Sequence, residues 1–176
     1  PNGSPFERNK DDVRLALVSK EAAQMKAPFI YVNMVGGQDE LVFEGDSIIV
    51  SESGEVLMRA AQFESDMLIA DLDLPSCGEN EILASGEKVV MLTGSVAHDH
   101  SFDIKREQQP RLDPNAEVYA ALVTALHDYV TKNGFKSVAL GLSGGIDSAL
   151  VAAIAADAIG AENVYGVAMP SKYSSE

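Results

Sequence analysis

The sequence has 176 residues and a mass of 18.7 kDa, which leaves room for one ordinary domain or two small ones. Apolar residues make up 46% and charged residues 23%, which is typical of a globular protein and excludes wholesale disorder. The net charge of −14 argues against nucleic-acid binding through phosphates, and no apolar run approaches the roughly 20 residues of a membrane helix.

The first elements along the chain are a helix and a set of strands. Residues 9–27 are predicted to be helical, because Asn9 is a suitable N-cap and Val13 and Leu17 lie on one apolar stripe. The strands predicted after this helix cover residues 29–35, which Gly36-Gly37 would end, and residues 47–51, 56–60 and 67–74. The second and third of these strands are expected to form a hairpin.

A polar segment with little periodicity, residues 103–113, is typical of a linker between two domains. We therefore predict one domain over residues 1–102 and a second over residues 114–176. The chain has a single cysteine, which can form neither an internal disulfide nor a thiolate metal cage. This fits a reducing compartment, and with no signal peptide at the start of the sequence we expect a cytoplasmic protein.

The second half is predicted to be a helix followed by a βαβ unit. The helix over residues 114–132 has Asp113 as its N-cap and proline at its first position. Its inner face is predicted to consist of Val118, Leu122, Ala125, Leu126 and Tyr129. A strand over residues 137–141, a helix over residues 148–159 and a strand over residues 163–169 follow. Because the connection is short, we expect the two strands to be parallel neighbours.

The loop between this strand and helix, Gly141-Leu-Ser-Gly-Gly-Ile-Asp-Ser148, carries the strongest chemical signal. Adjacent glycines let backbone N–H groups converge, the helix N-terminus adds further N–H groups, and Ser143 and Ser148 add hydroxyl donors. We expect the loop to bind a chain of phosphates, with Asp147 holding a Mg²⁺ that bridges to phosphate oxygens. The alternative is a plain glycine turn with Asp147 as a helix N-cap.

Residues 143–148 resemble the pyrophosphate loop of the N-type ATP pyrophosphatases, which cleave ATP between its α and β phosphates and adenylate a carbonyl oxygen. Residues 167–175 resemble the segment after the second strand of the glutamine-dependent NAD synthetases. Residues 2–6, Lys10 and residues 32–47 resemble the nitrilase-type glutaminase half of the same family. The resemblance thus covers essentially the whole chain, with the two halves in the family's order.

This resemblance implies an α/β fold with two parts. The first is the C-terminal part of a nitrilase-like α-β-β-α sandwich, and the second is the start of a Rossmann-like parallel-sheet ATP pyrophosphatase domain. The implied reaction is the ATP-dependent amidation of deamido-NAD to NAD with ammonia from glutamine, through an adenylated intermediate, with release of AMP and pyrophosphate. ATP and Mg²⁺ are the implied cofactors, and a homo-oligomer is implied as well.

The resemblance also assigns site residues. The residues implied to bind ATP or pyrophosphate are Gly141, Leu142, Ser143, Gly144, Gly145, Ile146, Asp147, Ser148 and Met169, of which Asp147 would also bind the metal. Ser4 and Lys10 match positions that hold the amino-acid end of glutamine. The catalytic Cys, Lys and Glu of the nitrilase family would precede Pro1, so we expect this chain to be the central span of a longer enzyme.

Several other residues have competing interpretations. Cys77 follows a predicted strand without a nitrilase signature around it, so a structural thiol is favoured over a nucleophile. His98 and His100 could bind a metal, but a solvated segment is favoured because no further ligand lies nearby in sequence. Lys172 could equally neutralise an ATP phosphate or be a surface charge. Residues 38–40 could line the glutaminase mouth, although a polar turn is favoured.

Two other functions stay open. One is another N-type ATP pyrophosphatase amidotransferase with a different acceptor, and the other is a non-catalytic fragment that serves as a binding module. The acidic charge argues against a tRNA acceptor. The nitrilase-like first half argues against the GMP and asparagine synthetases, which use other glutaminase folds.

Overall fold

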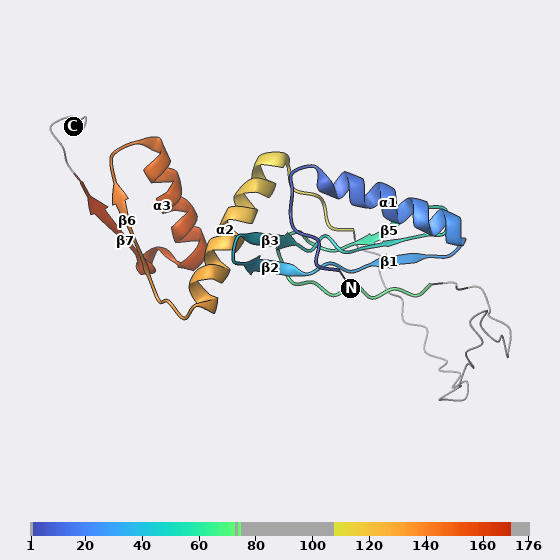
Figure 1. Ribbon diagram of the computed structural model, residues 1–176. Coiled ribbons are helices and arrows are strands. Elements are labelled where there is room, and N and C mark those ends of the chain that lie inside the picture. Colours follow the sequence, from blue (N-terminus) through green and yellow to red (C-terminus); the bar gives the residue numbers. More distant parts are fainter. Residues whose placement is uncertain (1, 73, 75–107, 170–176) are drawn as a thin grey trace.

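The structure is a computed structural model that describes residues 2–72, 74 and 108–169 (Figure 1). The elements of the first half are α1 (Lys10–Met25), β1 (Phe29–Tyr31), β2 (Val35–Gln38), β3 (Leu41–Glu44), β4 (Ile48–Val50) and β5 (Val56–Arg59). Those of the second half are α2 (Pro114–Lys132), β6 (Val138–Leu142), α3 (Ile146–Ile159), the 3₁₀ turn η1 (Ala161–Asn163) and β7 (Val164–Ala168). Within the described part of the chain, no helix combines the length and the apolar character that crossing a membrane requires.

The core of the first half lies between α1 and an antiparallel sheet with the strand order β1-β4-β5. Val18 and Ala22 of α1 pack against Ile48 and Val50 of β4. The helical pair is four residues apart and the strand pair two residues apart, so each pair lies on one face of its element. The predicted hairpin over residues 47–51 and 56–60 is confirmed as the β4–β5 pair.

Helix α1 buries a different face from the predicted one. Val13 and Leu17, which were expected to face inward, are 67% and 57% exposed. Arg14 is buried instead, because its guanidinium pairs with the buried carboxylate of Glu44. Asn9 does occupy the N-cap position, but its φ of 67° is left-handed and its side chain makes no capping hydrogen bond. A polar pair across the core therefore sets the rotation of α1, against the apolar pattern.

The predicted strand over residues 29–35 is divided between two sheets in the structure. β1 joins the sheet described above, whereas β2 pairs with β3, a strand that the sequence analysis does not predict. Gly36 and Gly37, which were expected to end the strand, lie inside β2. A Cβ at Gly37 would lie 3.2 Å from Cα of Ala125 in α2, so these glycines permit close packing of a helix rather than a chain reversal.

The strand predicted over residues 67–74 is wrong for residues 67–72 and 74, which form no strand. Met67 is 78% exposed. The Asp66 carboxylate accepts hydrogen bonds from the backbone N–H groups of Met67 and Ala61. Local side-chain bonds thus take the place of a strand ladder at the start of this segment.

The second half follows the sequence prediction more closely. The Asp113 carboxylate accepts hydrogen bonds from the N–H groups of Asn115 at 3.0 Å and Ala116 at 3.2 Å, which confirms it as the N-cap of α2. β6 and β7 are paired in parallel with α3 between them in sequence, as expected of a βαβ unit. α3 begins at Ile146, two residues before the predicted start.

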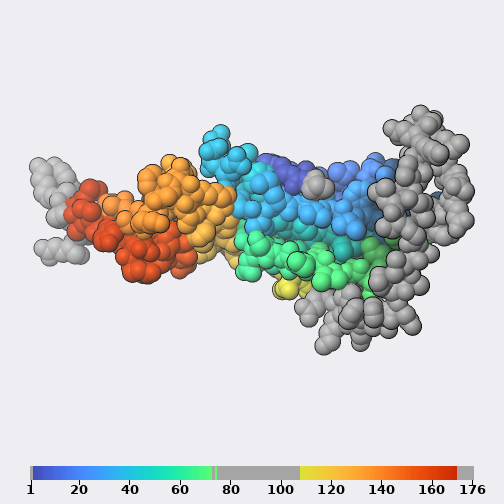
Figure 2. All heavy atoms as spheres, turned by 90° about the horizontal axis from the view of Figure 1, so that it is seen from below, coloured from blue at the N-terminus to red at the C-terminus, as the bar shows by residue number. Residues whose placement is uncertain are grey.

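Helix α2 lies between the two halves (Figure 1) and packs against the β2–β3 hairpin as well as against α3. This double contact makes part of its predicted inner face wrong, since Leu122 and Tyr129 are 46% and 55% exposed. The buried residues of α2 are Glu117, Ala121 and Val130. Figure 2 shows the orange and red second half joined to the blue and green first half across the yellow-orange α2.

Candidate functional site

The loop between β6 and α3 has an open form. Gly144 has a φ of 82°, a left-handed conformation that favours glycine. Gly145 has no such requirement, because its φ is −85° and a Cβ there would meet only Ser143 Oγ, at 3.5 Å. Neither the backbone nor the described neighbours therefore need glycine at position 145, and the space beside it can take a ligand.

Polar groups converge around this space. Ser143 Oγ and Ser148 Oγ lie 3.3 Å apart, and Ser143 Oγ accepts a hydrogen bond from the Gly145 N–H at 3.4 Å. Gly145 is the N-cap of α3, and no side chain among the described residues caps this helix end. The N–H groups of the first turn of α3 are thus free to donate to an anion.

Asp147 lies in the first turn of α3 and is exposed. Because Gly145 is the N-cap, the alternative interpretation of Asp147 as the N-cap is wrong. Within the described residues, no group of three His, Cys, Asp or Glu side chains could hold a metal ion. A Mg²⁺ at Asp147 would therefore take its other ligands from phosphate and water, which is how Mg²⁺ commonly binds beside nucleotides.

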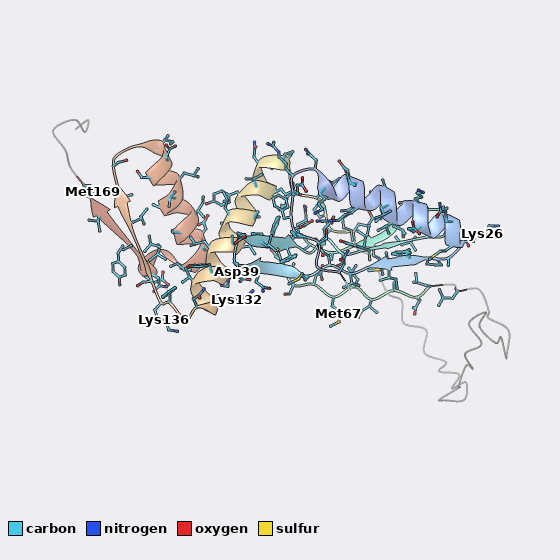
Figure 3. The ribbon with its side chains drawn as sticks, viewed as in Figure 1. Lys26, Asp39, Met67, Lys132, Lys136 and Met169 are labelled. Carbon is cyan, nitrogen blue, oxygen red and sulfur yellow. The ribbon has the colours of Figure 1, made fainter. Side chains whose placement is uncertain are left out.

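The carboxyl ends of β6 and β7 meet beside the loop. Leu142 pairs with Ala168, and the Met169 N–H donates to the Leu142 carbonyl oxygen at 3.3 Å. A Cβ at Gly141 would lie 2.5 Å from Met169 Cε, so glycine at position 141 lets the Met169 side chain lie against β6. Figure 3 labels Met169 at the end of β7. The structure thus brings Met169 to the same sheet edge as the loop.

A separate cavity of about 610 Å³ lies beside α1 and contains both residues that were predicted to bind glutamine. Its polar side is lined by Asn2, Ser4, Lys10, Arg14 and Glu21. Its apolar side is lined by Val13, Leu17, Val18, Met25, Phe29 and Tyr31. Lys10 Nζ donates to the Pro5 carbonyl oxygen at 3.2 Å, which holds the ammonium group close to the Ser4-Pro5 segment.

Arg14 is not among the predicted site residues, yet it holds the Ser4-Pro5 segment in place. Its Nε donates to Ser4 Oγ at 3.1 Å, and its Nη2 donates to the carbonyl oxygens of Ser4 at 3.3 Å and Pro5 at 2.9 Å. Asn33 completes the arrangement by accepting from Ser4 N–H and donating to Ser4 O. The sequence does carry one signal for Arg14, because it follows Lys10 by four positions and so shares its helix face.

The other candidates are settled only in part. Asp39 and Glu40 form the turn between β2 and β3, with a φ of 52° at Asp39, so the favoured interpretation as a turn is confirmed. Cys77, His98, His100 and Lys172 lie outside the described residues. The two candidate sites are far apart in Figure 1, since the cavity adjoins α1 and the glycine loop lies beyond α2.

Comparisons with known proteins match both halves. Residues 5–81 match the family described as carbon-nitrogen hydrolase, and residues 118–176 match the family described as NAD synthase. The chain is 44% identical to the glutamine-dependent NAD(+) synthetase of Aquifex aeolicus and 39% identical to that of Thermotoga maritima. Each match covers 99% of this chain and 32% of the relative. The chain therefore spans about a third of the length of these curated relatives.

A solved relative gives the same result at the level of structure. The glutamine-dependent NAD+ synthetase from Acinetobacter baumannii, in complex with adenosine diphosphate, is 41% identical with a TM-score of 0.77, over 99% of this chain and 29% of that one. The family resemblance and the α/β fold class are thereby confirmed: a nitrilase-like region over residues 5–81 precedes the start of an NAD synthase region that contains the parallel β6–β7 pair.

Proposed function

Because the chain corresponds to part of the glutamine-dependent NAD synthetases, we propose that the protein amidates deamido-NAD to NAD with ATP, using ammonia released from glutamine. Residues 1–102 belong to the glutaminase part of this activity, residues 103–113 to the linker and residues 114–176 to the synthetase part. The proposal includes a cytoplasmic location and a homo-oligomer, which the family resemblance implies.

The chemistry explains why a phosphate site is needed. The nicotinate carboxylate of deamido-NAD is a poor electrophile, so ATP must first adenylate it before ammonia can displace AMP. In this proposal the N–H groups at the start of α3 and the hydroxyls of Ser143 and Ser148 bind the departing pyrophosphate. Asp147 is the residue that would hold a Mg²⁺, which offsets phosphate charge when bound.

The open side of Gly145 is the observation that carries this assignment. A glycine that neither the backbone nor the described neighbours require is explained if a ligand lies against it. The ADP named with the Acinetobacter baumannii relative supports a nucleotide as that ligand. In this proposal Leu142 and Met169, at the ends of β6 and β7, flank the nucleotide, since ligands of parallel α/β sheets bind at this edge.

The cavity beside α1 supports the glutaminase part. Its polar side includes the Lys10 ammonium and the Ser4 hydroxyl, together with Asn2, Glu21 and the Arg14 guanidinium that pairs with Glu44. Because Ser4 Oγ accepts a hydrogen bond from Arg14, its own proton is free to be donated into the cavity. One hydroxyl donor beside the Lys10 ammonium suits the free carboxylate of glutamine, so we assign Ser4 and Lys10 to glutamine binding.

The experiment uses the complete enzyme that this proposal assumes and compares Gly145→Val with a control, Gly134→Asn. Valine at position 145 fills the open side of the loop, so synthesis of NAD from ammonia should fall at least about tenfold while glutamine hydrolysis persists. Gly134 has a φ of 76° with nothing within 4 Å of a Cβ, and asparagine tolerates that conformation, so both activities should survive there. Unchanged synthesis in Gly145→Val would contradict the phosphate assignment.

The glutaminase part is tested in the same enzyme with Ser4→Ala and Lys10→Ala. Each change should raise the KM for glutamine and leave synthesis from added ammonia unchanged, because ammonia bypasses the cavity. An equal loss with both nitrogen donors would show that these two residues support the fold instead of binding glutamine.

A further inference from the structure

The Gly36-Gly37 pair is a sequence motif that neither candidate site uses. It lies in β2, where the hairpin β2–β3 meets α2, and the two elements come from different halves of the chain. Figure 2 shows the light-blue hairpin as a protrusion beside α2, and Figure 3 labels Asp39 at its tip close to Lys132. The contact between the two halves therefore includes a defined point at these glycines.

Two side chains of α2 bind both polar backbone atoms of Gly37. The Asp128 carboxylate accepts from the Gly37 N–H at 2.7 Å, and Lys132 Nζ donates to the Gly37 carbonyl oxygen at 2.7 Å. Asp128 and Lys132 also pair with each other at 2.9 Å, four residues apart on the helix. We call these three residues the Gly37 clamp.

The titration of Asp128 agrees with this geometry. Partial burial raises the pKa of its carboxyl group, but hydrogen bonds from Lys132, from His127 and from the Gly37 N–H outweigh burial and lower the pKa from 3.8 to about 2. Asp128 is thus the charged acceptor of the clamp at neutral pH.

Side chains at the two glycines would block the clamp. A Cβ at Gly36 would lie 2.6 Å from Asp128 Oδ2, and one at Gly37 would lie 3.2 Å from Ala125 Cα. Gly36 also has a φ of 119°, whereas Gly37 is not among the residues with positive φ. A larger residue at position 37 is therefore compatible with the β-strand itself and incompatible with the docked position of α2.

A second contact fixes the other end of α2. Glu117 Oε1 accepts from Gln62 Nε2 at 2.7 Å, and Gln62 Oε1 accepts from the Leu112 N–H at 2.9 Å. Both Gln62 and Glu117 are 7% exposed. Residues 117 and 128 are about 16 Å apart along the helix axis, so the first half binds α2 at two well-separated points and thereby sets its direction.

The direction of α2 also determines where the loop between β6 and α3 lies. α2 packs against α3, and the Tyr119 hydroxyl donates to the Asp157 carboxylate at 2.6 Å. α3 begins within the loop itself, at Ile146. Moving the clamped end of α2 would therefore move the loop relative to the first half.

We propose that Gly37, Asp128 and Lys132 are positioning residues that keep the synthetase part aligned with the glutaminase part, so that ammonia released in one part reaches the other without escaping to solvent. This inference rests on the proposed function, since it assumes that both activities occur in one enzyme. It predicts a loss of coupling between the two activities rather than a loss of either one.

The test uses the complete enzyme with Gly37→Val and Asp128→Ala, and with Asp66→Ala as the control. Asp66→Ala also removes a carboxylate that accepts backbone hydrogen bonds, but its partners Ala61 and Met67 lie in the same half and do not contact α3 through it. In both clamp variants the amount of glutamine hydrolysed per NAD formed should rise, and NAD synthesis from glutamine should fall about tenfold relative to synthesis from ammonia. Asp66→Ala should leave this ratio unchanged.

The outcomes separate the two proposals. If the parent enzyme forms no NAD even from ammonia, the proposed function fails, and the coupling role fails with it. If the parent enzyme is active and the clamp variants keep the parental ratio, or lose synthesis from both nitrogen donors equally, the coupling role is refuted and the proposed function stands.

Discussion

Replacing Glu44 with glutamine isolates the charge of one buried carboxylate, because the two side chains have nearly the same shape. Glu44 is 1% exposed and pairs with Arg14, which is 7% exposed. Arg14 also donates to three neutral oxygens, namely Ser4 Oγ, Ser4 O and Pro5 O. The Glu44→Gln change therefore leaves a buried guanidinium with hydrogen-bond acceptors but without the carboxylate that pairs with it.

The expected cost follows from this environment. Removing one partner of a buried ion pair typically destabilises a protein by about 3–5 kcal/mol, and the neutral acceptors around Arg14 place this case near the lower end, at about 3 kcal/mol. With a urea m-value of about 1.5 kcal/mol per molar, the unfolding midpoint should fall by about 2 M. That is a large part of the roughly 5–15 kcal/mol that keeps a typical domain folded.

A double-mutant cycle supplies the control. Adding Arg14→Met removes the uncompensated charge, while Asn33 still donates to Ser4 O and Lys10 to Pro5 O. The double variant should therefore be about 1–2 kcal/mol more stable than Glu44→Gln alone, as measured by urea unfolding followed by circular dichroism. A cost below about 1 kcal/mol for Glu44→Gln, or additive effects in the cycle, would refute the buried-pair reasoning.

Three further predictions address other positions. Because the pKa of Asp128 is lowered from 3.8 to about 2, the charged carboxylate stabilises the folded state fully above about pH 4, and this stabilisation is lost as the pH falls toward 2. After allowance for solvent screening, the unfolding free energies of the parent and of Asp128→Asn should differ by about 1 kcal/mol at neutral pH. The two values should converge at low pH. Gly144→Ala should lower stability by about 1 kcal/mol in thermal unfolding because φ is 82° there, whereas Gly145→Ala should cost almost nothing; equal costs would contradict the assignment of an open side to Gly145. Cys77→Ser in the complete enzyme should leave NAD synthesis from glutamine unchanged, and labelling of Cys77 by a glutamine-analogue electrophile, detected by peptide mapping, would contradict its structural role.

The sequence predicts the second half well because its signals are local. Asp113 before Pro114 is an N-cap signal that depends on neighbouring residues alone, and the observed helix begins there. The strand, loop and helix around residues 138–159 follow from an apolar run interrupted by two glycines. The structure places Met169 beside Gly141, because parallel pairing aligns the ends of β6 and β7.

Predictions in the first half fail where a contact partner lies far away in the sequence. Gly36 and Gly37 have the composition of a turn, and only the approach of α2, about ninety positions later, explains why glycine is needed inside a strand. Val13 and Leu17 form a regular apolar stripe, yet the opposite charge of Glu44 draws Arg14 inward. A local sequence pattern does not show which distant residues will contact a segment, so it cannot predict these two outcomes.

Buried polar pairs account for the rotation of α1, and they also connect the elements that the candidate sites depend on. Arg14 and Glu44 join α1 to β3 and thereby fix the Ser4-Pro5 segment at the cavity. Gln62 and Glu117 join the first half to α2. A hydrophobic contact tolerates small sliding, but a buried hydrogen bond loses its partner when either element shifts, so each pair fixes one relative position of two elements. If polar pairs set the alignment of the two halves, substitutions that break them should change the relation between the two activities before they abolish either one, whereas truncation of apolar core residues such as Ile48 or Val50 should reduce both together.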